Sequence, residues 1–504
     1  MSDAVDHGIT VTEIAALDQP IDVKPHTIAA FVGSASRGPV NTRVLVKSFG
    51  EFRRRFGDSR SRSSLGPAAQ QFFEHGGSHL YVVRVANKAR GAMICLPASG
   101  SALVLRAAEP GSSEVIRAAV DYDGVDDNEH FNLVLQRLDP VTRLIDDQEF
   151  FDKVSYVDGS ERFVGEALAS SSLAHVEHPY PSHRPERTVG PDYIEAAQAG
   201  HDGAVLSDYD LIGSRSEGTG LFALQQAGSF DLLYLPALAE GADIGPAATL
   251  AAEMFCRERR AMLIVDPCRA WQSAADAVHG VRELGYASPN ILGYFPRMRE
   301  RNGELQSIGG AIAGLLCKQD RMVGPWGDLE QSGLGLQREL APAQEINDGE
   351  AALLHRAGLN VITDGTAGCA RVTGSVTMAR GYQAHRTFAR LPVRRFCLRI
   401  ISAIRDATKW SIFEDWDKNL ARRVRAQVLA YFYSLSDHGA FADEDFAVDC
   451  DAGVSKRADK DEHGVTLMLR FRPVGSDEAV SLTLHLTASG CRVGSTAFGP
   501  QELT

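Results

Sequence analysis

The segment from residue 27 to residue 85 constrains the fold more than any other part of the chain. It begins with the apolar run Ala29–Val32 and ends with the apolar run Leu80–Val85. Between these runs, three phenylalanines recur at intervals of three and four residues: Phe49, Phe52 and Phe56. Apolar strands that alternate with an amphipathic helix are typical of α/β proteins. We therefore predict an α/β core.

Local signals set the ends of the helices in this segment. Ser48 is a suitable N-cap for the phenylalanine-rich helix, and Gly57 ends it. The stretch Gln70–His75 reads as the end of a second helix. Gly76 and Gly77 then supply a C-terminal cap and a tight turn before the second strand.

The loop after the first strand resembles the beginning of a phosphate-binding loop but lacks its chemistry. A P-loop needs the pattern GxxxxGK[ST], whereas here Gly33 and Gly38 are followed by Pro39 and Val40. Pro39 also removes a backbone donor at the position where a phosphate would need one. The sequence therefore predicts a structural turn here.

The same motifs, in the same order, resemble the beginning of contractile tail sheath proteins. This family is shared by contractile phages, R-type bacteriocins and extracellular contractile injection systems. Its pattern runs from an FVG strand end to a loop ending in RGPVN, a VLV strand, a helix of the form SxxEFxxxFG and an FFx[NH]GGxxxYVVRV element. The corresponding segments of this chain are Phe31–Gly33, Arg37–Asn41, Val44–Val46, Ser48–Gly57, Phe72–Gly77 and Leu80–Val85.

Composition and charge exclude several classes of protein. With 504 residues, of which 44% are hydrophobic and 23% charged, the chain is expected to form about three domains. A formal net charge of −13 argues against nucleic-acid binding as the main role. The eight cysteines lack CxxC spacing, which indicates neither a zinc site nor a disulfide framework. We expect no metal site and no cofactor.

The chain shows no secretion signal and no span for membrane insertion. Its first residues lack a basic segment followed by an apolar one, and no run of about 18 apolar residues occurs. We therefore expect synthesis in the bacterial cytoplasm. The family resemblance adds assembly into a virion tail or an injection particle that can be released from the cell.

The first 25 residues contain one short strand-like run, with Ile9, Val11 and Ile14 as its apolar positions. A strand of this length is not stable alone and must pair with a sheet. The resemblance implies an extended N-terminal arm, residues 1–25, that adds a strand to a neighbouring subunit. The alternative is a strand that folds back onto its own domain.

Residues 26–92 form the first part of the predicted core, and residues 93–177 read as an inserted all-β domain. Short alternating runs, among them Phe131–Val134 and Phe163–Val164, are separated by turn residues. The resemblance implies a sandwich-like insert. Four acidic residues lack the spacing of a calcium-binding loop and favour a solvated hairpin turn: Asp121, Asp123, Asp126 and Asp127.

Residues 178–202 are rich in proline and read as a linker. Three histidines fall in or just before it: His175, His178 and His183. Because prolines separate them, no helix can align their side chains, and a surface loop is the better interpretation than a metal site.

Residues 203–364 return to an α/β pattern and are predicted to complete a doubly wound core. Apolar strands at Asp231–Pro236, Ala261–Pro267 and Ile291–Pro296 alternate with helices, a layout that sheath proteins share with subtilisin-like sheets. Asp266 follows a strand, where α/β proteins bind ligands, and this suggests a hydrolase-like enzyme with accessory domains as the alternative. No nucleophile motif accompanies it, so we expect a turn-capping role and no enzyme activity.

Residues 365–504 read as an α+β domain with one long helix, Trp416–Ser434, and two strands, Val465–Phe471 and Val480–Leu486. The polar side of the helix is basic, at Lys418, Arg422, Arg423 and Arg425. The resemblance implies an inner domain in which this basic face docks on acidic tube subunits; a solvated face remains the alternative. It also implies that the strands receive a neighbour's arm, through Leu467, Leu469, Phe471, Leu482 and Leu484.

The resemblance as a whole implies a structural subunit without bond chemistry. Such subunits form a helical homo-oligomer of stacked hexameric rings around an inner tube, with baseplate and terminal cap proteins as further partners. Contraction then drives the tube through a target envelope.

Overall fold

The computed structural model describes most of the 504-residue chain. The described ranges are 20–23, 26–57, 63–189, 192–239, 241–300, 303–337, 340–365, 369–379, 388–413, 418–450, 464–487 and 490–496. The predicted arm residues Ile9, Val11 and Ile14 lie outside these ranges.

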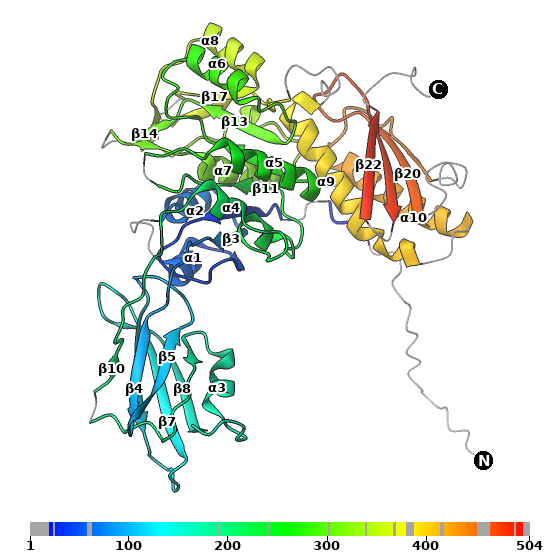
Figure 1. Ribbon diagram of the computed structural model, residues 1–504. Coiled ribbons are helices and arrows are strands. Elements are labelled where there is room, and N and C mark those ends of the chain that lie inside the picture. Colours follow the sequence, from blue (N-terminus) through cyan, green and yellow to red (C-terminus); the bar gives the residue numbers. More distant parts are fainter. Residues whose placement is uncertain are drawn as a thin grey trace, which may run out of the picture.

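Three bodies follow one another across the molecule (Figure 1). A β-rich body, drawn in cyan at the bottom, lies below a central α/β body. A third body, drawn in yellow to red, lies to the side of the central one and contains two long helices and a sheet.

The central body is built on an eight-stranded sheet in the order β18-β17-β13-β12-β11-β1-β3-β2. Its strands are β1 (Ala29–Gly33), β2 (Arg43–Val46), β3 (Leu80–Arg84), β11 (Leu232–Tyr234), β12 (Met262–Val265), β13 (Ile291–Phe295), β17 (Leu359–Thr363) and β18 (Arg371–Thr373). The inner strands are parallel, and the edge strands β2 and β18 are antiparallel to their neighbours. A parallel sheet buries both faces, which explains the continuous apolar runs of its strands.

Helices cover both faces of this sheet. One face packs on α1 (Phe49–Phe56), α2 (Leu65–Glu74) and α7 (Gly309–Met322). The other packs on α4 (Asp208–Ile212), η2 (Gly220–Leu224), α5 (Pro246–Arg259), α6 (Ala274–Leu284) and α8 (Asp348–Ala357). Side chains of β1 alternate between the two cores, since Phe31 lies in the first and Val32 in the second. Beside this sheet lie a small sheet, β15-β14-β16 (Leu305–Gln306, Met298–Glu300, Leu340–Pro342), and the turn η3 (Glu330–Ser332).

The predicted helix caps are present. The Ser48 Oγ accepts a hydrogen bond from the backbone N–H of Glu51 at 3.1 Å. Gly57 ends α1 with φ +92°, and a Cβ there would lie 2.0 Å from the Ser36 hydroxyl. A side chain at this position would therefore clash with the loop that follows β1.

The β-rich body, residues 93–177 with part of the following segment, consists of two sheets. One has the order β4-β5-β9 (Met93–Ala98, Ser101–Ala107, Ala174–Glu177). The other has the order β10-β6-β7-β8 (Ile194–Glu195, Val115–Asp121, His130–Leu138, Ile145–Ser155). Residues of both sheets, such as Leu103 and Leu133, share one apolar core. We call this body the insert.

Two details of the insert differ from the prediction. Phe163–Val164 is not a strand, because Val164 begins the helix α3 (Val164–Ala167), which continues as η1 (Leu168–Ser170). Phe163 instead makes an isolated bridge with Ser155 and packs its ring on Tyr180. The predicted linker also contributes a strand, since β10 pairs with β6.

The third body contains α9 (Leu391–Ala407), η6 (Lys409–Phe413) and α10 (Lys418–Asp437). Its sheet has the order β19-β20-β21-β22 (Ala447–Asp449, Gly464–Phe471, Val480–Thr487, Gly490–Thr496). The apolar stripe predicted for the long helix is buried: Leu420, Val424, Val428, Tyr431, Phe432 and Leu435. We call this body the C-terminal domain. Together the three bodies confirm the mixed α/β class predicted from the sequence.

Candidate functional site

The sheet of the C-terminal domain is held on its helices by the residues that the sequence singled out. Their side chains are at most 2% exposed and face the core formed with α9 and α10: Leu467, Leu469, Phe471, Leu482 and Leu484. Neighbouring positions point outward, since Met468 is 39% exposed. These apolar residues therefore attach the sheet to its helices, and strand addition would have to use the backbone at an edge.

The two edges of this sheet lie on β19 and β22, because β20 and β21 are inner strands. At one edge, β19 pairs only with Met468, Leu469 and Arg470 of β20. Among the described residues, no strand of this sheet lies beside Gly464–Leu467 on that side. Unpaired backbone N–H and C=O groups of this kind are a template for a strand from another chain. The chain therefore offers the first half of β20, and the outer side of β22, as candidate acceptors.

The basic face of α10 is partly engaged within the chain. Arg425 Nε donates to the carbonyl oxygen of Val448 at 2.7 Å and so holds β19 to the helix. The Arg423 guanidinium lies 4.4 Å from the centre of the Trp410 ring. Arg422 is exposed, and Lys418 is the first residue of the helix. Of the predicted docking residues, Arg422 and Arg425 are both exposed, but the Arg425 side chain also bonds to β19.

The last part of the predicted arm, residues 20–23, lies against the same helix. Ile21 and Val23 pack on the C-terminal core. Pro20 and Ile21 also line a groove of about 500 Å³ together with Arg422, Arg423 and residues of the next two turns of α10. The described end of the arm is therefore anchored on α10.

Arginines at the start of α9 fasten the C-terminal domain to the central sheet. Arg395 Nη2 donates to Asp320 Oδ2 at 2.5 Å, and both side chains are 4% exposed. Thr27 donates to the same oxygen at 2.6 Å, and Arg399 contacts Thr27 and Asp231, each at 3.0 Å. Burial opposes the charge of Arg395, but the attraction of Asp320 outweighs it and raises the pKa of this guanidinium.

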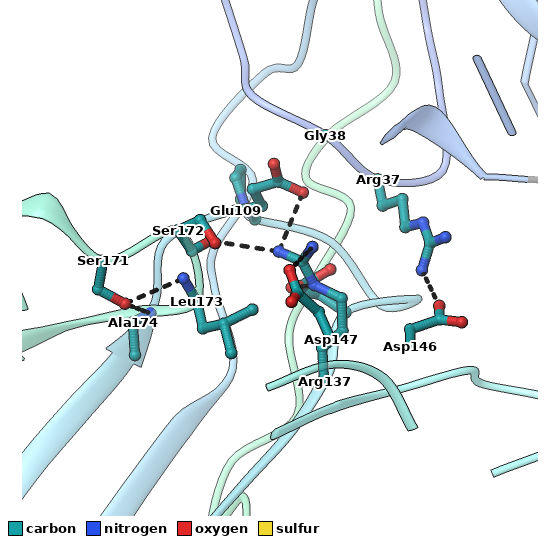
Figure 2. Close-up of polar contacts among 12 residues, drawn as sticks. Arg37, Gly38, Glu109, Arg137, Asp146, Asp147, Ser171, Ser172, Leu173 and Ala174 are labelled. Carbon is teal, nitrogen blue, oxygen red and sulfur yellow. Dashed lines mark hydrogen bonds and ion pairs between the residues drawn. The ribbon is translucent and has the colours of Figure 1, made fainter. Parts of the chain in front are cut away.

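A second set of arginines joins the insert to the central body (Figure 2). Arg37, in the loop after β1, donates to Asp146 of β8 at 2.7 Å. Arg84, at the end of β3, is 2% exposed and donates to the carbonyl oxygens of Gly38 and Pro110 at 2.6 and 2.7 Å. The contacts of Arg37 with Asp146 and of Arg84 with Pro110 cross from the central body to the insert and fix the joint between them.

Arg137 organises the insert side of this joint. Its guanidinium is 2.6 Å from Glu114, 3.6 Å from Glu109 and 4.0 Å from Asp147. Glu109 and Glu114 are buried, and each has an oxygen without a hydrogen-bond partner. Burial raises the pKa of the Glu114 carboxyl against the attraction of Arg137.

Asp266 caps the start of the helix α7, which lies much further along the chain than the turn predicted from the sequence. Its Oδ1 accepts from the backbone N–H groups of Ile308 and Gly309 at 3.1 Å, at the start of α7, and its Oδ2 accepts from the Tyr234 hydroxyl at 2.5 Å. The carboxylate thus complements the positive end of a helix dipole. Asp266 also borders a largely apolar cavity of about 310 Å³, where the neighbouring polar groups Asp243, Cys268 and Arg297 bond to one another or to the chain.

The histidine, cysteine and acidic residues considered as metal ligands do not form a metal site within the described ranges. Within the described ranges, no group of three or more His, Cys, Asp or Glu side chains is placed to hold a metal ion. Asp121 and Asp127 instead accept backbone N–H groups of their own hairpin turn. Among the described residues, no disulfide joins any two of the cysteines. No described helix is both long and apolar enough to span a bilayer.

Sequence reasoning missed the two arginine joints and the sheet edges. Arg37 and Arg84 stand in the RGP and YVVRV motifs, so a signal was present, but their acceptors lie far away in sequence. The edge strand β22 contains glycines at both Gly490 and Gly494, a composition that strand patterns disfavour. Neither ion-pair partners nor strand order can be read from periodicity.

Comparisons with solved structures and with a family model agree with this architecture. Over about 94% of its length, the chain is similar in fold to solved sheath proteins. A sheath tail protein from Listeria innocua is 14% identical with a TM-score of 0.63, covering 94% of this chain and 97% of that one. A sheath tail protein from Desulfitobacterium hafniense is 13% identical with a TM-score of 0.59, covering 95% of this chain and 100% of that one.

A solved structure described as the anti-feeding prophage helical sheath in contracted state is 14% identical, with a TM-score of 0.55, and covers 94% of this chain and 98% of that one. In addition, the family model of the phage tail sheath C-terminal domain matches residues 383–487, which comprise α9, α10 and most of the sheet beside them. A comparison with curated proteins found no match. The resemblance predicted from the motifs is thereby confirmed.

Proposed function

We propose that this chain is the structural subunit of a contractile sheath. Copies polymerise helically around an inner tube, and shortening of the polymer drives the tube through a target envelope. The observation that carries the proposal is the match of residues 383–487 to the phage tail sheath C-terminal domain. Sheath folds over nearly the whole chain support it.

Each body of the chain then has a role in the polymer. Residues 26–92 and 203–364 form a doubly wound, subtilisin-like core, residues 93–177 an inserted β domain, and residues 365–504 the inner domain that faces the tube. The basic residues of α10 dock on acidic tube subunits, through Lys418, Arg422, Arg423 and Arg425. Baseplate and cap proteins bind the two ends of the polymer, whose rings are hexameric.

The N-terminal arm links the subunits by strand addition. The arm is anchored on α10 at Ile21 and Val23, and the incompletely paired edge of β20 begins at Gly464. In this proposal, Ile9, Val11 and Ile14 of one copy pair at the edge of a neighbour's sheet. Four or five ladder hydrogen bonds, at about 0.5 to 1.5 kcal/mol net each, would add several kcal/mol to each link.

Contraction needs no bond chemistry in this proposal. The free energy comes from the difference between two packings of the same subunits, an extended lattice and a contracted one. The arms keep neighbours connected while the folded bodies move.

Removal of residues 1–19 tests this function. The purified full-length chain should form tubes visible by negative-stain electron microscopy. The truncated chain should keep its thermal unfolding midpoint but remain monomeric in sedimentation, because in this proposal residues 1–19 pair with a neighbouring copy. A full-length chain that stays monomeric with its tube protein present would contradict the proposal, and a hydrolase would keep its oligomeric state after truncation.

A further inference from the structure

Charge is distributed unevenly along the chain. Residues 93–177 contain sixteen Asp and Glu and only six Lys and Arg, which gives the insert a formal charge of −10 out of a total of −13. Residues 26–57, in contrast, contain six Lys and Arg and one Glu. The chain therefore presents opposite charges on its insert and on the first helix of its core.

The basic charges gather on α1. Arg53, Arg54 and Arg55 follow one another in its last turn and are exposed. None of the three guanidiniums forms an ion pair with any described residue. One such arginine would suffice to complement the helix dipole. We call these three residues the arginine face; it is adjacent to the edge strand β2, whose first residue, Arg43, is also exposed.

A group of exposed acidic residues lies at the end of the insert that is distant from the core. His130 pairs with Ser155, and the Ser155 hydroxyl donates to Glu129, so the loops 122–129 and 156–162 lie together. Asp126, Asp158 and Glu161 are exposed in these loops, and among the described residues their carboxylates form no ion pair. We call these two loops the acidic tip.

One chain cannot bring its own two surfaces together. The opposite end of β7 carries Arg137, and the start of β8 carries Asp146, which is fixed to Arg37 at the joint with the core. The nine-residue strand β7 separates this joint from the tip, a length of about 30 Å at 3.3 Å per residue. Figure 1 shows α1 beside the near end of the insert and the far loops pointing away from it.

We propose that the acidic tip of one copy docks on the arginine face of a second copy. This inference rests on the proposed function and names one of the contacts that builds the polymer. Two different, complementary surfaces on one chain form a head-to-tail interface, which generates an open helix when the rotation does not close. Nucleic acid is a less suitable partner for the arginine face. The strongly acidic insert lies directly below α1 and would repel the phosphate backbone of a nucleic acid.

Charge reversal on both sides tests the contact. The first variant is Arg54→Glu/Arg55→Glu, the second is Asp126→Lys/Asp158→Lys, and the third combines all four changes in one chain. The matched control is Arg282→Glu/Arg356→Glu, which reverses exposed last-turn arginines on α6 and α8, at the other end of the core (Figure 1). Polymer formation with the tube protein is measured by sedimentation and electron microscopy at several chain concentrations.

Each of the first two variants should raise the concentration needed for polymer about tenfold or more, because like charges then face each other. The combined variant should recover most of this loss, and the control should behave as the unchanged chain. Recovery also excludes misfolding as the cause, since extra substitutions do not repair a misfolded domain.

Three results would overturn the inference. One is polymerisation of both reversal variants at the unchanged concentration; the proposed function would then stand and only this contact would fall. Another is a loss for the arginine variant alone, which would assign the face to a different occupant such as the tube or a nucleic acid. The third is failure of the unchanged chain to polymerise, which would remove the proposed function and this contact together.

Discussion

Buried arginines tie together parts of this chain that are distant in sequence. Arg395 reaches Asp320 and Arg37 reaches Asp146, and each pair joins two different bodies. A guanidinium suits this task because its planar fork can bind a carboxylate and a carbonyl oxygen at once. Arg84 shows the second use, since it donates to backbone carbonyls on the two sides of the insert joint.

Loss of Arg395 should be among the most destabilising single changes. Arg395→Ala leaves the Asp320 carboxylate buried with Thr27 as its remaining donor. Removing one partner of a buried ion pair costs about 3 to 5 kcal/mol, whereas the exposed control Arg282→Ala should stay within about 0.5 kcal/mol. Urea unfolding of the arm-deleted monomer measures both, and equal values for the two variants would contradict the role given to Arg395.

His75 should make stability depend on pH. Its Nδ1 donates to the Gln71 carbonyl and its Nε2 accepts from the Gln337 N–H, so the native contacts need the neutral ring. Burial lowers the pKa of His75 below its ordinary value. The unfolded chain therefore binds a proton first, and stability is lost as pH falls below about 6.5.

The variant His75→Gln tests this dependence, since its amide can also donate and accept. The unfolding midpoint of the unchanged chain should exceed that of the variant at pH 7.5. The gap should narrow toward pH 5, where protonation of the unfolded His75 penalises only the unchanged chain. A gap that stays constant between these pH values would rule out the buried neutral ring as the cause.

At the scale of helices and strands, periodicity was a reliable guide. The spacing of apolar residues located α1, α10 and the inner strands, because burial of one face imposes a period on the sequence. It missed β8, whose first half contains the acidic residues Asp146, Asp147 and Glu149, and it missed the two-residue strand β10 in a proline-rich segment. These elements form through pairing with neighbours, which no local pattern encodes.

The same limit applies to the candidate site. The two strands predicted to receive an arm are present as β20 and β21, but the order β19-β20-β21-β22 makes them inner strands, and only this order shows which backbone is open. Similarly, the basic residues of α10 were found, but their uses differ: Arg425 holds β19, and Arg423 stacks on Trp410. Long-range contacts, which one sequence does not reveal, decide the role of each residue.

This difference among the arginines sharpens the test of tube docking. Arg422→Glu should reduce co-assembly with tubes about tenfold without destabilising the domain, because reversal of a contact charge costs binding and an exposed change costs little folding free energy. Co-sedimentation with the tube protein measures the first effect and thermal unfolding the second. The matched control is Arg356→Glu on α8, and equal co-assembly of both variants would leave the basic face without a docking role.

On the scale of the whole molecule, the C-terminal domain and the insert both contact the central body next to β1. Thr27, just before β1, contacts the C-terminal domain, and Arg37, just after β1, contacts the insert. A displacement of either outer body therefore acts on the ends of one strand. In a polymer that changes its packing, this arrangement would let the insert and the inner domain move with the core as a unit.

The insert joint allows a direct test of such rigid coupling. Arg37→Ala and Asp146→Asn each remove an ion pair that crosses from the loop after β1 to β8. A charged hydrogen bond of this kind contributes about 1.5 to 3 kcal/mol, reduced here because Asp146 is 33% exposed. A double-mutant cycle is needed, since Arg37 also donates to the carbonyl oxygen of Arg54 in α1.

Asp147→Asn is the matched control, because Asp147 is the next residue on β8 and faces Arg137 inside the insert. In the arm-deleted monomer, the Arg37 and Asp146 variants should separate thermal unfolding into two transitions and broaden the distance distribution seen by small-angle X-ray scattering. The control should keep one transition and the original distribution. If all three variants match the unchanged chain, the orientation of the insert is set by its two connecting segments, and the proposal that this ion pair makes the bodies move together is wrong.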